Sequence, residues 1–323
     1  MPFADPVPLN ADLLFVIGQG KTGTSTVVGI LNSHPDILLF YEAYLIRHNP
    51  ILPRRIELQK TYPDLSPLLD SAPTFRDTYL RAGGYFQERG HSYRYFGEKM
   101  LSKMLSEEQM RSAGQFRVIF VVRDIRTWLC KNIVVSAFIQ SEDLATMAVR
   151  YVDDLLQTFA WPKCLRIRME DLILQNDRVL ADLSAFLGLE LAQTASNWWD
   201  TIGHYPDGDP KRAIDWWSHH DSSRLKPTRQ DTEVTLRDHP LWHALLPVFD
   251  KYYGNPATVF PPDEIVADRQ RLRQVLPCSV THEDLYESVR SVSFGSGPEG
   301  AAGHRSTNPK AKPFLIGSKE TSE

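Results

Sequence analysis

The residues with the clearest chemical potential lie in one stretch near the start of the chain, Gly18-Gln-Gly-Lys-Thr-Gly-Thr-Ser25. An apolar run at residues 13–17 precedes it, too short for a helix and rich in strand formers. Thr24 and Ser25 are good N-cap residues for the apolar helix that follows. A glycine-rich turn directs several backbone N–H groups to one point, in front of a helix N-terminus. The stretch therefore predicts an anion site, most often for phosphate; the alternative is a turn with only a structural role.

The position of the lysine separates this loop from an ATP-binding one. In the Walker A pattern, the lysine follows the second conserved glycine and reaches the β- and γ-phosphates. Gly18 and Gly23 have the spacing of that pattern, but Thr24 comes next, and the lysine is Lys21, inside the loop. We expect such a loop to hold a shorter anion and to place its lysine near the atom that departs.

These residues carry a resemblance to a known family. The segment Gly20-Lys-Thr-Gly-Thr-Ser25 resembles the 5′-phosphosulfate loop of sulfotransferases that use 3′-phosphoadenosine 5′-phosphosulfate (PAPS). The resemblance implies that PAPS is the co-substrate and that no metal is needed. The residues that it places around the 5′-phosphosulfate are Gly20, Lys21, Thr22, Gly23, Thr24 and Ser25.

A second segment, Val118-Ile-Phe-Val-Val-Arg-Asp-Ile125, extends the resemblance. These sulfotransferases typically have a strand, then Arg-Asp-Pro, and a Ser eight residues after the Arg; the Arg and Ser hold the 3′-phosphate. Arg123 matches that Arg, while Ile125 replaces the Pro and Lys131 stands where the Ser is expected. The resemblance implies Arg123 and Lys131 as 3′-phosphate ligands, in a pocket of altered geometry, because the next serine, Ser136, comes five positions too late. Without a phosphate, Arg123 is a solvated arginine or an ion-pair partner of Asp124.

A third segment supports the family without carrying chemistry. Leu165-Arg-Ile-Arg-Met-Glu-Asp-Leu172, with Phe186-Leu-Gly-Leu189 after it, is similar to a strand and helix common to these enzymes. We interpret Glu170 and Asp171 as structural. The resemblance covers about residues 13–190.

Sulfuryl transfer needs a cation at the leaving oxygen and a base at the acceptor. Lys21 is the predicted leaving-group cation. Glu42, in Phe-Tyr-Glu-Ala-Tyr, resembles the base of the carbohydrate-type branch, and Lys99, in Phe-Gly-Glu-Lys-Met, resembles a lysine that lies near the sulfonate. A surface ion pair is the alternative for each. His34 is the rival base, although its Asn-Ser-His-Pro context favours a helix stop.

Apolar strands alternate with amphipathic helices, which predicts an α/β fold with a parallel sheet flanked by helices, P-loop-like and of the sulfotransferase type. Strands are expected at residues 13–17, 37–41, 93–99, 117–122 and 165–168, and helices at 141–159, 178–187, 241–253 and 262–276. Each charged group follows a strand, so the groups should converge at one edge of the sheet.

Composition limits the class of protein, its compartment and its domain organisation. The 323 residues carry a net charge of −4, which does not indicate nucleic-acid binding. Three dispersed cysteines have neither metal-ligand nor CxxC spacing, and no apolar run approaches a membrane span, so we expect a cytoplasmic protein without a structural metal. A single domain should span residues 1–290, with a lid or acceptor region at 198–240 and a disordered tail at 291–323. The resemblance to sulfotransferases implies that such a late segment supplies a basic residue to the 3′-phosphate, and Arg224 and Arg229 are the two candidates, between which no motif selects.

The predicted function is transfer of a sulfuryl group from PAPS to a hydroxyl or amine of a small-molecule or carbohydrate acceptor. A P-loop-type kinase or NTPase is one alternative; it would need an apolar strand ending in a Mg²⁺-binding Asp, and here Arg123 comes before Asp124. A non-catalytic nucleotide-binding relative is the other, since Ile125 and Lys131 depart from the family pattern. The acceptor and the oligomeric state stay open.

Overall fold

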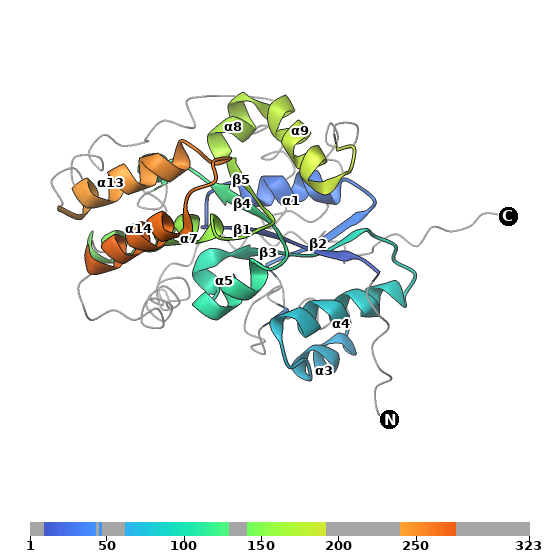
Figure 1. Ribbon diagram of the computed structural model, residues 1–323. Helices are drawn as coiled ribbons and strands as arrows, with labels where there is room; N and C mark the ends of the chain where they lie inside the picture. The colour runs from blue at the N-terminus through green and yellow to red at the C-terminus, as the bar shows by residue number, and fades with distance from the viewer. Residues whose placement is uncertain (1–9, 43–44, 47–61, 129–140, 192–239, 276–323) are drawn as a thin grey trace, which may run out of the picture.

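The sheet is the organising layer of the structure (Figure 1). The computed structural model describes residues 10–42, 45–46, 62–128, 141–191 and 240–275. Its five strands are all parallel, in the order β2-β3-β1-β4-β5. Their bounds are β1 Asp12–Gly18, β2 Ile37–Tyr41, β3 Tyr95–Leu101, β4 Arg117–Val122 and β5 Cys164–Arg168. This arrangement confirms the predicted α/β fold class.

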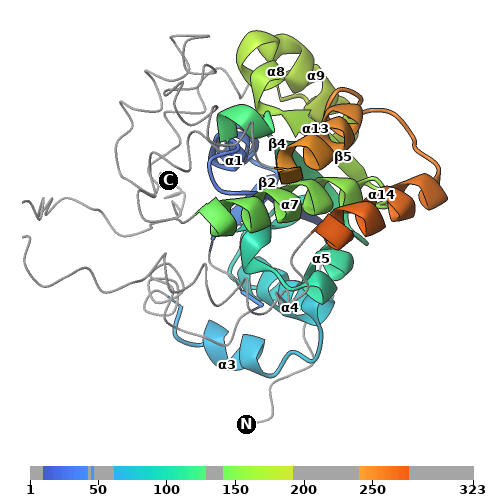
Figure 2. The same cartoon turned by 90° about the vertical axis from the view of Figure 1, so that its left-hand side faces the viewer.

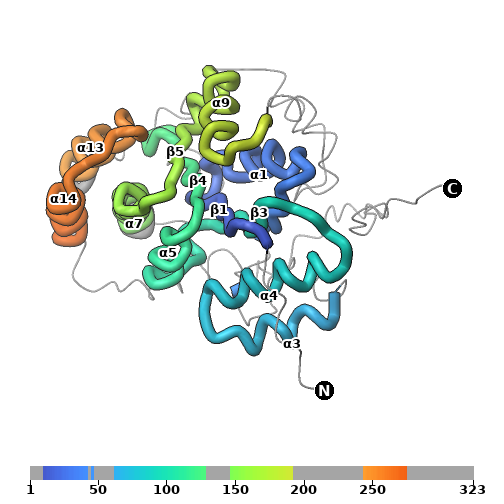
Figure 3. Tube along the Cα trace, turned by 45° about the vertical axis from the view of Figure 1, so that its right-hand side comes forward, coloured from blue at the N-terminus to red at the C-terminus, as the bar shows by residue number. Residues whose placement is uncertain are grey.

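Helices cover both faces of the sheet. On one face lie α1 (Thr24–Asn32), α8 (Met169–Leu174) and α9 (Asn176–Leu187), and on the other α4 (Phe75–Gln87), α5 (Glu107–Ala113) and α7 (Ser141–Thr158), as Figures 1 and 3 show together. Two further helices, α13 (Pro240–Tyr253) and α14 (Pro262–Val275), pack outside α7 (Figure 2). The short α3 (Leu65–Asp70) packs on α4, and the 3₁₀ turn η1 (Ser102–Met104) follows β3.

The central strand β1 is buried on both faces, as its apolar run predicts. Phe15 packs into the α4–α5–α7 side of the core, and its neighbours Leu14 and Val16 pack into the α1–α8–α9 side. Gly97 of β3 lies against β1 so closely that a Cβ there would come within 1.8 Å of the Leu14 carbonyl oxygen. A side chain at this position would force the two strands apart.

The strands and helices expected from the sequence are all observed within two residues of their expected ends, but two details are wrong. The third strand begins at Tyr95 and runs to Leu101, so Glu98 and Lys99 lie inside it. The sheet tolerates Glu98 because its carboxylate accepts hydrogen bonds from the Tyr79 hydroxyl (2.7 Å) and the Leu45 N–H (3.1 Å).

The second wrong detail is the start of α1. Gly23, with a φ of 95°, is the N-cap, and no side chain caps the helix. Thr24 and Ser25 instead form its first turn, because the glycine supplies the left-handed conformation that ends the loop.

Several predictions lie outside the described residues. These concern Lys131 and Ser136, the proposed lid with Arg224 and Arg229, and the tail at 291–323. Among the described helices, none combines the length and apolar character of a membrane span. The described residues also hold no cluster of three or more metal-ligating side chains of His, Cys, Asp or Glu.

Candidate functional site

The loop between β1 and α1 is held by its carbonyl groups. The Thr22 hydroxyl donates to the Gln19 carbonyl oxygen (2.7 Å), and the Trp128 indole N–H donates to the Gly20 carbonyl oxygen (2.8 Å). The backbone N–H groups of Gly20, Lys21 and Gly23 have no acceptor among the described residues. The N–H groups of the first two residues of α1, Thr24 and Ser25, come too early in the helix for an intrahelical acceptor, whereas those of Thr26 and Val27 donate to the Gly23 carbonyl oxygen. The loop therefore offers the donors that an anion needs, while the carbonyls of Gln19, Gly20 and Gly23 accept hydrogen bonds from within the protein.

Two residues of the described chain are non-glycine residues with positive φ: Lys21 (70°) and Glu42 (51°). This conformation is uncommon for residues with a Cβ and persists only where the surrounding structure imposes it. Both were selected from the sequence as catalytic residues, Lys21 from the loop and Glu42 from the segment after β2. Backbone strain of this kind concentrates at functional sites.

Glu42 and Lys99 lie together at the carboxyl end of the sheet. The Lys99 ammonium forms an ion pair with the Glu42 carboxylate, and the Glu42 N–H donates to the Lys99 carbonyl oxygen at 3.0 Å. Lys99 is 2% exposed, whereas the Glu42 side chain is 27% exposed. The pair is therefore reachable from outside through its carboxylate.

Tyr41 joins this pair to the loop. The Lys99 ammonium lies 4.6 Å from the centre of the Tyr41 ring, and the Tyr41 hydroxyl is hydrogen-bonded to the Ser25 hydroxyl in the first turn of α1. Loop, tyrosine, lysine and carboxylate thus form one continuous array. The predicted convergence of β1, β2 and β3 residues at one edge is observed for these groups.

Lys103 belongs to the same charge cluster and was not predicted. It lies in η1 and is half-buried, with no hydrogen bond or ion pair to any described residue. Burial lowers its pKa; the Glu42 charge opposes this, and the charges of Arg150 and Lys21 lower the pKa further. Because the sequence predicts that the third strand ends at Lys99, Lys103 was not considered as a site residue. A second lysine four residues after Lys99, still near the end of that strand, could have indicated it.

Arg123 follows β4 at the same edge. It is buried, and its guanidinium Nε donates to the Thr127 hydroxyl at 2.9 Å. Asp124 forms its ion pair with Arg126 (2.8 Å), and its N–H donates to Glu170 at 3.0 Å. Glu170 therefore has a structural role at this turn.

Asp171 is structural as well, because both of its carboxylate oxygens accept from Arg168 at 2.7 Å. His34 lies at the opposite edge of the sheet. Its Nδ1 accepts from the Asp36 N–H at 3.1 Å, next to the start of β3, where the Asp36 carbonyl accepts from Tyr95. The loop and His34 are separated by the whole of α1, so His34 is not brought to the site.

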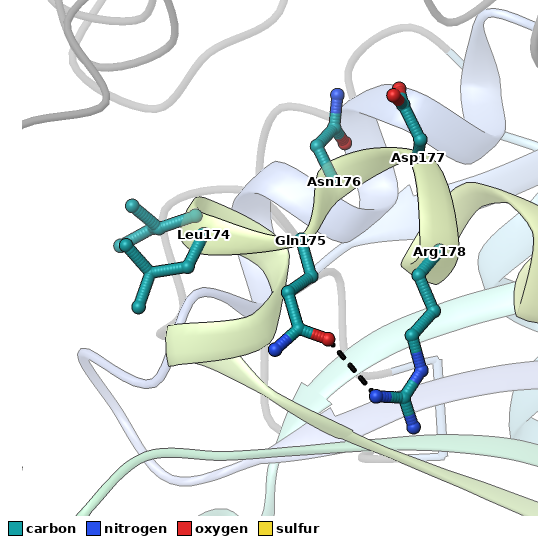
Figure 4. Close-up of a pocket in the computed structure, with 6 residues that line it drawn as sticks. Leu174, Gln175, Asn176, Asp177 and Arg178 are labelled. Carbon is teal, nitrogen blue, oxygen red and sulfur yellow. Dashed lines mark hydrogen bonds between the residues drawn. The ribbon is translucent and has the colours of Figure 1, made fainter.

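A surface hollow lies at the junction of α8 and α9 (Figure 4). It is lined by residues 173–178, and the Arg178 guanidinium donates to the Gln175 side-chain oxygen across it at 2.9 Å. None of the predicted site residues lines it.

No family model and no curated protein matches this sequence. Three solved structures to which the chain is similar are all sulfotransferases. The sulfotransferase domain of the Synechococcus PCC 7002 olefin synthase is 16% identical, with a TM-score of 0.42, over 86% of this chain and 100% of that one. Sulfotransferase STF9 from Mycobacterium avium is 15% identical, with a TM-score of 0.40, over 67% and 77%. A mouse sulfotransferase complexed with PAP is 14% identical, with a TM-score of 0.36, over 85% and 88%.

Proposed function

We propose that this protein transfers a sulfuryl group from PAPS to a hydroxyl or amine of a small-molecule or carbohydrate acceptor. The observation that carries the proposal is that Lys21 and Glu42, chosen from the sequence as leaving-group cation and base, are both in the left-handed conformation at one edge of the sheet. Strained backbone at non-glycine residues persists where the surrounding structure imposes it and concentrates at functional sites, so its presence at both residues supports a functional role for them.

The residues present fit the anionic groups of PAPS. The loop N–H groups that have no acceptor in the described part of the chain suit the 5′-phosphosulfate together with Lys21, and the Arg123 guanidinium suits the 3′-phosphate. Lys131 stays a proposed second ligand of the 3′-phosphate.

In the proposed reaction, the acceptor oxygen forms a bond to sulfur while the bond from sulfur to the bridging oxygen of the phosphosulfate breaks. The acceptor proton passes to the Glu42 carboxylate. The negative charge that develops on the leaving 3′,5′-adenosine bisphosphate is met by Lys21 and the loop N–H groups. Lys99, held against Glu42, adds positive charge near the sulfonate that is transferred.

The site does not support the alternative of a P-loop-type kinase, which would need a Mg²⁺-binding carboxylate after an apolar strand. The carboxylate that follows β4, Asp124, is engaged by Arg126.

The proposal is tested by supplying PAPS with a panel of hydroxyl and amine acceptors and measuring release of the bisphosphate, with Lys21→Ala as the blank. Acceptor-dependent release that disappears in the blank supports it; consumption of ATP in place of PAPS would move the protein to another reaction class, and nucleotide binding without any turnover would favour the non-catalytic relative.

Arg123→Ala is expected to weaken binding of 3′,5′-adenosine bisphosphate about 10- to 100-fold, because a hydrogen bond between charged groups contributes about 1.5–3 kcal/mol. Adenosine 5′-monophosphate, which has no 3′-phosphate, should bind the variant as it binds the wild type. Calorimetric titration of both nucleotides measures this. An equal loss for both would mean that Arg123 acts on the fold and not on the 3′-phosphate.

Because its charge interacts with those of Glu42 and Lys21, Lys103 is a further proposed cation beside the sulfonate. Lys103→Met is therefore expected to lower kcat about 10²-fold, the smaller end of the cost of removing a preorganised cation, while binding of the bisphosphate stays unchanged because that product has no sulfonate. Lys103→Arg should keep most of the activity. Lys163→Met is the matched control, since Lys163 is exposed and precedes β5 at the other edge of the sheet. Loss of activity in both Met variants would show that Lys103 has no special part in the site.

A further inference from the structure

The helix α7 contacts both of the proposed anion-binding segments, although it carries none of their residues. Tyr151 and Asp154 lie one helical turn apart, so they share a face of α7. Both are buried, at 1% and 3% exposure. A buried carboxylate and a buried phenol are costly in a core unless their hydrogen bonds are made, which directs attention to their partners.

Tyr151 holds the backbone of Arg123 on both sides. Its hydroxyl accepts from the Arg123 N–H at 2.7 Å and donates to the Arg123 carbonyl oxygen at 2.6 Å. Both groups belong to the residue whose side chain is proposed to bind the 3′-phosphate. The backbone of Arg123, from which its side chain extends, is therefore held by α7.

The phosphate loop, residues 18–25 from the end of β1 to the first turn of α1, is held from the same face of α7. The Gln19 side-chain amide donates to the Asp154 carboxylate at 2.8 Å. The next loop residue, Gly20, accepts from Trp128, and the Trp128 ring stacks on Tyr151 with centres 4.3 Å apart and planes 20° apart. Two adjacent loop residues are thus tied to α7, one directly and one through Trp128.

We infer that Tyr151, Trp128 and Asp154 are positioning residues that fix the span between the phosphate loop and Arg123, and so select nucleotides with anionic groups at both the 3′ and 5′ positions. The inference rests on the proposed function, because it takes the loop and Arg123 as the two anion sites. Fully hydrogen-bonded buried networks of this kind are rigid, as a fixed span requires. The three side chains act through the loop and Arg123 and do not themselves touch the nucleotide.

The test compares two ligands that differ by one group, 3′,5′-adenosine bisphosphate and adenosine 5′-monophosphate, in calorimetric titrations of the full chain. Tyr151→Phe releases Arg123 but leaves the ring stacked on Trp128. We expect its affinity for the bisphosphate to fall about 10-fold, in line with the loss of buried hydrogen bonds, while its affinity for the monophosphate stays that of the wild type. Asp154→Leu should weaken both ligands, because it releases the loop that holds the 5′ group.

Tyr252→Phe is the matched control. Tyr252 is also a buried tyrosine, and its hydroxyl donates to Asp268 at 3.0 Å, between α13 and α14 and away from the loop. It should lower thermal stability as Tyr151→Phe does and leave the ratio of the two affinities unchanged. If Tyr151→Phe fails to fold, Trp128→Phe serves as a second variant, since it keeps an aromatic ring but loses the N–H that donates to Gly20. It should weaken binding of both ligands, because it too releases the loop.

An unchanged ratio of bisphosphate to monophosphate affinity in Tyr151→Phe, with the wild type binding both, would overturn the inference alone. Equal binding of the two ligands to Trp128→Phe and to the wild type would also overturn it. If the wild type binds neither nucleotide, the proposed function falls and the inference falls with it. These outcomes are distinguishable in one set of titrations.

Discussion

Replacing Lys21 by Ala is expected to lower kcat about 10²- to 10³-fold, the cost of removing one preorganised donor at a developing negative charge. Lys21 is exposed, so its loss creates no cavity and should leave the fold intact. The measurement is single-turnover transfer from PAPS at saturating acceptor, with thermal unfolding as the check on folding.

Two further variants at this position sharpen the result. Lys21→Gly removes the same charge but suits the positive φ of 70°, so it should be as inactive as Lys21→Ala and more stable. Lys21→Arg keeps the charge and should recover part of the rate. Activity near that of the wild type in Lys21→Ala would remove Lys21 from the leaving-group role.

Glu42→Gln is expected to lower kcat about 10²- to 10⁴-fold, the range that general-base catalysis contributes. The change keeps the size of the side chain but leaves the buried Lys99 ammonium without its carboxylate, so a loss of stability should accompany it. Stability and chemistry must therefore be separated. The measurement is transfer from PAPS at saturating acceptor, alongside binding of the bisphosphate, which should not change.

The separating variant is Glu42→Gln combined with Lys99→Met, which removes both charges of the pair. It should regain stability relative to Glu42→Gln alone and stay inactive. Recovery of the rate together with stability would show that Glu42 serves only to neutralise Lys99. His34→Ala should keep full activity, because His34 lies at the other edge of the sheet; loss of activity there would revive the histidine as base.

The strands and the loop were predictable because they depend on local pattern. Apolar runs bounded by glycine or charge located β2 and β4 to the residue, and the loop glycines marked the turn after β1. A parallel sheet then brings strand ends to one edge without further information. That rule places Lys21, Glu42 and Arg123 at one edge, whereas the roles proposed for them depend on the resemblance to sulfotransferases.

What the pattern could not supply is which way a side chain faces and what it meets across the chain. Glu98 and Lys99 are adjacent charges, yet Glu98 faces Tyr79 and Lys99 faces Tyr41 and Glu42. The contact between Gln19 and Asp154 joins residues 135 positions apart, so no local window contains it. Nothing in its local sequence therefore distinguishes Asp154 from an ordinary polar residue of an amphipathic helix.

The central claim is that the loop and Arg123 together hold a 3′,5′-bisphosphorylated nucleotide without metal. Calorimetric titration of the wild-type protein with 3′,5′-adenosine bisphosphate in the presence of EDTA tests this most directly, with ATP and Mg²⁺ titrated in parallel. The account predicts saturable binding of the bisphosphate that needs no metal and is stronger than binding of ATP. Binding of ATP with Mg²⁺ and none of the bisphosphate would contradict it.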